Sequence, residues 1–211
     1  MNTNARRWKR RALIALVFAA VLACAAFWYL RGHNSPPIAA TGGSSFTNFV
    51  AIETPFYLQR DDRWKDETIR SGETLAKVGC TVSSLAMALA HYGVAFTPKT
   101  LNDALKDNGG YTRRGWLQWN AVSKISGGKV SVRVMDKPTH RDIDTALRAQ
   151  QPVLAKVFIN HVIPHWVLVV SKEGSEYLMR DPLNEKKTLT RVSSYGSDIY
   201  GVRIVQPGET R

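Results

Sequence analysis

The feature that most constrains this chain is an uncharged apolar run near its N-terminus. Residues 12–30 contain no charged residue and no proline. As an α-helix this run would be about 28 Å long, close to the roughly 30 Å hydrocarbon core of a bilayer. Trp28 and Tyr29 lie at its far end, where interfacial aromatic side chains are favoured. The run therefore predicts a transmembrane signal-anchor over residues 12–30.

The residues around this run predict its orientation. Residues 1–11 carry five basic side chains and no acidic one. Positive charge next to a membrane span is retained on the cytoplasmic side. We therefore expect a single-pass membrane protein with a basic cytoplasmic end and an extracytoplasmic, periplasmic domain.

Two alternatives to an anchor remain open. Ala23-Cys24-Ala25 fits the small-x-small pattern of signal-peptide cleavage, which would release a secreted protein. Cys24 is also a candidate for lipidation, although Leu22 fits that pattern poorly. The apolar run continues to Leu30, beyond both of these processing sites, which favours the anchor. The anchor and both alternatives place the rest of the chain outside the cytoplasm.

The remaining sequence predicts one domain behind a linker. Residues 31–50 contain Pro36-Pro37, Gly42-Gly43 and Ser44-Ser45 and almost no charge, which predicts a flexible tether. Residues 51–207 are expected to form the globular domain. A hydrophobic content of 44% and a charged content of 22% are typical of globular proteins.

The net charge of +12 gives little reason to expect a nucleic-acid partner. Half of it comes from residues 1–31, which leaves a net charge of +6 over the other 180 residues. No long basic stripe is present. The charge fits an anionic cell-envelope surface equally well.

Helical patterns dominate the first half of the domain. Val82, Leu85, Ala86 and Leu89 recur at helical spacing, and Gly93 predicts the end of that helix. Thr97-Pro98 predicts the start of a second helix. Two further helices are expected over residues 116–125 and from Thr139 to about Gln150.

Strand patterns dominate the second half. A strand over residues 129–135 is followed, after the last helix, by four more, at 153–159, 165–171, 176–180 and 199–205. Helices followed by an antiparallel sheet predict an α+β fold, two layers around one core.

The candidate nucleophile is Cys80, the one thiol in the globular part. It follows Gly79 and directly precedes a predicted helix, whose N-terminal dipole would favour the thiolate. The alternative is a small buried apolar residue, the usual fate of a free cysteine. No CxxC or Cys/His spacing indicates a zinc site.

The candidate base is His165, at the start of a strongly apolar strand. If residues 172–174 form a hairpin loop, His165 lies opposite Asp181 on the same sheet face, where a carboxylate can orient an imidazole. The alternative is an edge histidine and an unrelated turn aspartate. His161 is a second candidate base.

Gln59 is a candidate oxyanion donor, acting with the main-chain N–H of Cys80. Its alternative role is a structural amide. Four tryptophans are candidates either for the core or for a substrate groove, namely Trp64, Trp116, Trp119 and Trp166.

Taken together, these motifs resemble a known family. They are Gln59 to Trp64, Gly79 to Met87, Tyr92-Gly93, Thr97-Pro98, His165 to Val169, and Asp181-Pro182. Their order is similar to that in bacterial cysteine peptidases of family thirty-nine, related to the double-glycine leader peptidases, in the papain-like superfamily. The likeness covers about residues 54–183.

The resemblance implies a papain-like fold and thiol-mediated hydrolysis without metal or cofactor. It implies Cys80 as nucleophile, His165 as base, Asp181 as orienting residue and Gln59 in the oxyanion hole. Relatives often have glycine where this chain has Pro164. The transporter-linked members also carry an exporter that this sequence lacks, so glycine-glycine specificity is not expected.

The expected function is hydrolysis of an amide bond in a peptide or protein substrate through a thioester. Two alternatives remain open. One is acyl or peptidyl transfer, or cell-wall peptide hydrolysis, by the same fold. The other is a tethered binding module without turnover. The sequence predicts neither the substrate nor the oligomeric state.

Overall fold

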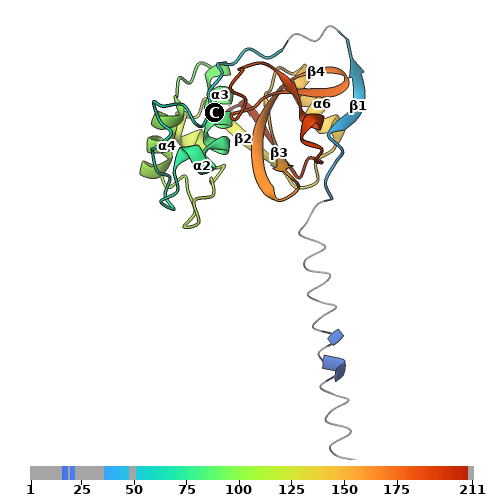
Figure 1. Ribbon diagram of the computed structural model, residues 1–211, viewed down its shortest axis with the longest axis horizontal. Coiled ribbons are helices and arrows are strands. Elements are labelled where there is room, and N and C mark those ends of the chain that lie inside the picture. The colour runs from blue at the N-terminus through green and yellow to red at the C-terminus, as the bar shows by residue number, and fades with distance from the viewer. Residues whose placement is uncertain (1–15, 19, 22–35, 48–50, 209–211) are drawn as a thin grey trace, which may run out of the picture. The chain divides into compact units, whose positions relative to one another are not determined.

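A computed structural model describes residues 16–18, 20–21, 36–47 and 51–208 (Figure 1). It divides into two compact units, Met1–Pro36 and Pro37–Arg211. In the first unit, residues 16–18 and 20–21 are helical. The rest of the predicted span over residues 12–30, and the basic end over residues 1–11, lie outside the described residues. Within the described part of the chain, no helix has the length and hydropathy needed to cross a bilayer.

The second unit has the α+β layout predicted from the sequence. Its helices are α2 (Leu75–Val78), α3 (Cys80–His91), α4 (Pro98–Asp107), α5 (Ala121–Ile125), α6 (His140–Arg148) and the 3-10 helix η1 (Val192–Tyr195). Its strands are β1 (Thr41–Phe46), β2 (Val130–Met135), β3 (Val153–Ile159), β4 (Ile163–Arg180), β5 (Thr190–Arg191) and β6 (Gly201–Pro207). The sheet order is β1-β4-β3-β6-β2, and β5 pairs with β4. Every one of these pairings is antiparallel.

The helix starts predicted from cap residues are confirmed. The Thr97 side chain accepts a hydrogen bond from the Thr100 N–H, and the Thr100 hydroxyl oxygen accepts one from the Thr97 N–H. Thr139 forms the same reciprocal box with Asp142 at the start of α6. These boxes satisfy N–H groups that a helix leaves without internal partners, so they fix where α4 and α6 begin.

The core lies between α3 and the sheet. Residues 82–89 of α3 are all buried, which reflects a helix surrounded by other elements rather than lying at a surface. Figure 1 shows α2, α3 and α4 gathered beside the strands. Ser84 donates a hydrogen bond to the Trp166 carbonyl at 3.1 Å, which fixes α3 against β4. The two elements that carry Cys80 and His165 are therefore packed directly on each other.

One helical prediction needs correction, and one short helix was missed. Only Ala121–Ile125 of the predicted helix over residues 116–125 is helical, because Leu117 instead pairs with Tyr111 in an isolated β-bridge. The short helix α2 was not predicted, since four residues are too few to show a hydrophobic period.

The predicted strands at 165–171 and 176–180 form one continuous element, β4. The predicted loop over residues 172–174 is part of this strand because β1 pairs there, with Phe46 opposite Gly174. The sequence prediction missed this pairing because it did not include β1.

β4 nevertheless folds back on itself. His165 Nε2 lies 2.8 Å from Asp181 Oδ1, although a straight strand would separate the two residues by about 50 Å. Gly174 has a φ of +58°, in the left-handed region that glycine adopts readily. The fold-back brings together the residue near the start of β4 and the residue just after its end.

The prediction of a flexible tether over residues 31–50 is wrong for residues 38–46. Residues 41–46 form β1, and Ile38 pairs with Ile199. A Cβ atom on Gly42 would lie 2.6 Å from His140 Nε2, and one on Gly43 would lie 2.4 Å from Asp144 Oδ2. These glycines permit close packing of β1 against α6, whereas their composition alone resembles that of a linker.

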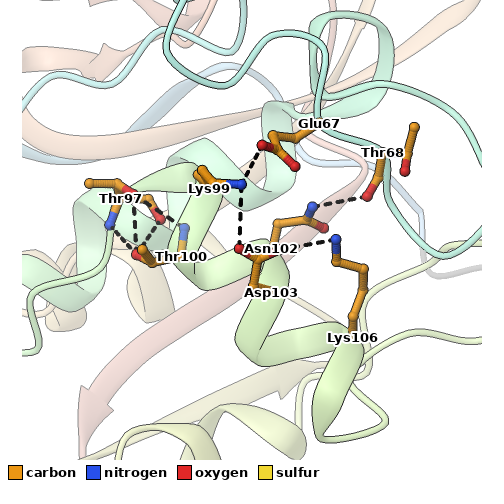
Figure 2. A network of polar contacts seen from close by, with 8 residues as sticks. All are labelled: Glu67, Thr68, Thr97, Lys99, Thr100, Asn102, Asp103 and Lys106. Carbon is orange, nitrogen blue, oxygen red and sulfur yellow. Dashed lines mark hydrogen bonds and ion pairs between the residues drawn. The ribbon is translucent and has the colours of Figure 1, made fainter.

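A polar network on α4 fixes the loop that precedes α2 (Figure 2). Asn102 is buried, donates to the Thr68 carbonyl at 3.0 Å and accepts from the Tyr111 hydroxyl at 2.8 Å. On the surface, Lys99 pairs with Glu67 and lies 3.7 Å from Asp103. The loop between Gln59 and Cys80 is thereby held to the helical layer.

Candidate active site

Cys80 is the first residue of α3, and its side chain is almost fully buried. Among the residues described, it forms no disulfide. Gly79 has a φ of −78°, so glycine is not needed here for a left-handed backbone conformation. A Cβ at position 79 would instead lie 2.4 Å from the Leu75 carbonyl oxygen. Glycine is required here so that α2 can pack directly against the start of α3.

His165 and Asp181 form a buried pair. Their exposed fractions are 2% and 7%, and the His165 Nε2 to Asp181 Oδ1 distance is 2.8 Å. The prediction that the two side chains are neighbours is therefore confirmed. Because Asp181 occupies Nε2, Nδ1 is the ring nitrogen left for another partner.

Three donors hold the Asp181 carboxylate. Oδ1 accepts from the Leu183 N–H at 2.9 Å as well as from His165, and Oδ2 accepts from the Tyr195 hydroxyl at 2.5 Å. Burial raises the pKa of Asp181, but the hydrogen bond and charge of His165, and the bonds from Tyr195 and Leu183, outweigh it. The pKa is consequently below its usual value, and the carboxylate is ionised.

The thiol of Cys80 and the imidazole of His165 interact directly. Burial raises the pKa of Cys80. The hydrogen bond from His165 and the positive charge of its ring lower that pKa by more than burial raises it. The Trp166 N–H and the Thr81 hydroxyl also lower it. The net pKa of Cys80 lies below that of an ordinary thiol, which favours the thiolate.

The pKa of His165 moves in the opposite direction. Burial lowers it, but hydrogen bonds to Asp181 and Cys80, together with their negative charges, raise it to about 9. The imidazolium is therefore retained up to about pH 9, well above the ordinary value near 6.5. A lowered thiol pKa beside a raised imidazole pKa describes a thiolate–imidazolium ion pair.

Gln59 is buried and connects the elements on either side of the pair. Its main-chain N–H donates to the Pro182 carbonyl at 3.0 Å, next to Asp181, and its side-chain Nε2 donates to the Ala76 carbonyl at 2.8 Å. Within the described structure, its Oε1 has no hydrogen-bond partner. One amide hydrogen is thus engaged and the other remains available, so its oxyanion role stays a prediction.

The remaining candidate side chains differ in exposure and in their contacts. His161 is exposed in the turn between β3 and β4. Trp64 is buried and donates to the Leu58 carbonyl at 2.7 Å, whereas Trp116 is 64% exposed. Trp119 and Trp166 pack against each other with ring centroids 5.5 Å apart.

A surface hollow of about 300 Å³ is lined by residues 62–64 and 66–68, which include none of the four predicted site residues. No cluster of three metal-ligating side chains occurs in the part of the chain that the structure covers.

Sequence reasoning missed Tyr195. It lies fourteen residues beyond Asp181, in a segment without helical or strand periodicity. Nothing in the sequence links it to the site, because its position depends on η1 packing against β4 and β3.

A thiol at a helix N-terminus, paired with an imidazole and a carboxylate on a sheet, is the arrangement that cysteine hydrolases use. The chain belongs to the Peptidase C39 family, whose model matches residues 75–195. This confirms the family that the sequence motifs resemble.

Solved structures are also similar to this chain. A protein from Bacillus anthracis named as a C39-like peptidase is 16% identical, with a TM-score of 0.49, and the match covers 75% of this chain and 98% of that chain. No curated protein sequence matches the chain significantly.

Proposed function

We propose that the chain is a papain-like cysteine peptidase that hydrolyses a peptide bond through a thioester on Cys80. His165 is the base and Asp181 orients it. The observation that carries this proposal is the buried contact from Cys80 through His165 to Asp181, with the thiol pKa lowered and the imidazole pKa raised. Membership of the Peptidase C39 family supports the same chemistry.

The first half of the reaction follows from the ion pair. The Cys80 thiolate attacks the carbonyl carbon of the scissile amide, and the carbonyl electron pair moves to oxygen. The second amide hydrogen of Gln59 and the Cys80 N–H stabilise this oxyanion. When the tetrahedral intermediate collapses, His165 Nδ1 gives its proton to the leaving amine and a thioester remains.

The second half consumes water. Neutral His165 removes a proton from the water molecule, whose oxygen attacks the thioester carbonyl. Collapse of that intermediate releases a carboxylic acid and regenerates the thiolate beside the imidazolium. Throughout, Asp181 stabilises the imidazolium and keeps Nδ1 directed at the sulfur.

The ion pair can be tested without knowing the substrate. We expect His165→Ala to slow alkylation of Cys80 by iodoacetamide at pH 6 by at least about tenfold, because burial alone would then raise the thiol pKa. Peptide mapping by mass spectrometry measures the rate at Cys80 separately from that at Cys24. The wild-type rate should be nearly constant across the pH range of the ion pair and change again near pH 9, as His165 loses its proton.

His161→Ala is the matched control, since it removes the second candidate base, which lies in an exposed turn. It should leave the alkylation profile of Cys80 unchanged. Equal rates for wild type and His165→Ala at pH 6 would show that the imidazole does not activate the thiol. A change with His161→Ala alone would transfer the role of base to that residue.

We also propose that residues 12–30 anchor the enzyme, with residues 37–208 on the extracytoplasmic side. The uncharged apolar run and the five basic residues before it support this. The full chain should therefore sediment with membranes and resist carbonate extraction, and added protease should reach the domain in spheroplasts. Release of a shortened chain into the periplasm or medium would instead indicate signal cleavage. Labelling by a fatty-acid probe that is lost in Cys24→Ala would indicate lipidation.

A further inference from the structure

Tyr195 contacts both members of the orienting pair. Its hydroxyl donates to Asp181 Oδ2 at 2.5 Å, the carboxylate oxygen that His165 does not use. Its ring lies against the His165 imidazole, with the centroids 5.6 Å apart and the planes tilted by 58°. One side chain therefore limits rotation of the carboxylate and covers the imidazole.

The fold holds Tyr195 on both sides. In the same short helix η1, Val192 is fully buried and Ser193 donates to Glu176 Oε2 of β4 at 2.7 Å. Just after the helix, the Ser197 hydroxyl accepts from the Phe158 N–H of β3 at 3.0 Å. An element fixed to both β4 and β3 leaves the phenol little freedom to leave Asp181.

We propose that Tyr195 is a positioning residue for the thiol chemistry of this site, acting on His165 and Cys80 through the Asp181 carboxylate. This inference rests on the proposed function. Asp181 then accepts hydrogen bonds at both oxygens, and neither oxygen is free to turn away from the imidazole. The catalytic unit is a chain of four side chains, Tyr195, Asp181, His165 and Cys80.

Among the described residues, the charged and titratable groups that act on these four side chains are the four side chains themselves. Asp181 and the Leu183 N–H come from the turn after β4, His165 from β4 and Cys80 from α3. Loss of the Tyr195 hydroxyl removes a donor that lowers the pKa of Asp181. Asp181 would then take up its proton at a higher pH, and a less firmly held imidazolium would stabilise the thiolate less. Both changes move the acidic limb of Cys80 reactivity to higher pH.

The test is the pH profile of Cys80 alkylation in the full chain, with Tyr195→Phe, which removes only the hydroxyl. We expect the acidic limb to rise by about half to one pH unit, which slows the reaction on that limb about three- to tenfold. Tyr200→Phe is the matched control, because Tyr200 is 48% exposed and packs on Phe158. It should leave the profile unchanged.

A double-mutant comparison separates positioning from general structural support. In an Asp181→Asn background, Tyr195→Phe should have no further effect on the profile, since it acts through that carboxylate. A full additive effect there, or a Tyr195→Phe profile identical to wild type, would overturn the proposal. If the wild-type profile itself is that of an ordinary thiol, the proposed function fails instead.

Should Tyr195→Phe not fold, as judged by circular dichroism, 3-fluorotyrosine at position 195 keeps the ring and donates more strongly. The acidic limb should then move to lower pH. A limb that does not move would count against the proposal.

Discussion

Cys80→Ala should abolish peptide hydrolysis, lowering kcat by at least about 10³-fold, because neither His165 nor Asp181 can form the thioester in its place. To measure hydrolysis, the full chain is incubated with a peptide library, and new peptide ends are detected by mass spectrometry. This variant keeps His165 and Asp181, so a loss of hydrolysis would result from the missing thiol and not from a change in the rest of the site.

Cys24→Ala is the control, since it makes the same substitution at the other cysteine of the chain. It should leave turnover at the wild-type level. Products retained by Cys80→Ala would exclude Cys80 as the nucleophile. Products joined to an added amine such as glycinamide, in excess of hydrolysis, would assign the enzyme to acyl transfer. An unreactive Cys80 with no turnover would favour a binding module.

The part of the site that could be predicted is the part that depends on local pattern. Cys80 can be predicted because apolar residues at helical spacing begin just after it, and that segment is α3. His165 and Asp181 were paired by assuming that two apolar strands fold back around Gly174. The assumed loop is in fact strand, yet the two residues do meet. They meet because β4 reverses direction between them.

The missed features depend on contacts between distant segments. Tyr195 reaches Asp181 only because η1 packs on β4. The segment Thr41–Phe46 has the glycines and serines of a linker, but it forms strand β1 against β4. Composition cannot distinguish a glycine that gives flexibility from one that permits close packing, because the difference lies in the partner. Here the partner is α6, about 100 residues further along the chain.

A buried ion pair fastens β1 to the rest of the domain. Lys172 Nζ lies 2.6 Å from Asp144 Oδ1 and donates to the Gly42 carbonyl at 2.6 Å, while the Ser44 N–H donates to Asp144 Oδ2 at 2.6 Å. The Tyr177 hydroxyl donates to Asp144 Oδ1 at 3.1 Å. The two charged side chains are 0% and 5% exposed. The segment through which residues 1–36 continue into the domain is thus held at the middle of β4, the strand that positions His165.

Lys172→Met should lower the free energy of unfolding by about 3–5 kcal/mol, because it leaves the Asp144 carboxylate buried without its cation. Denaturant unfolding measures this change. Adding Asp144→Asn should recover much of the loss, since the amide is neutral, its oxygen can accept from the Ser44 N–H, and its nitrogen can donate to the Tyr177 hydroxyl oxygen. A double variant no more stable than Lys172→Met alone would show that the unpaired charge is not the cause.

Lys99→Met is the matched control for Lys172→Met, because it makes the same substitution in an ion pair at the surface (Figure 2). Lys99 pairs with Glu67, and their side chains are 44% and 31% exposed. Solvent screens such a pair, so we expect Lys99→Met to lower the free energy of unfolding far less than Lys172→Met does. If the two lysine variants lose equal stability, burial of the Lys172–Asp144 pair has no special effect. A large loss confined to Lys172→Met, with faster amide exchange at Ser44, would show that β1 is held to the domain by that pair.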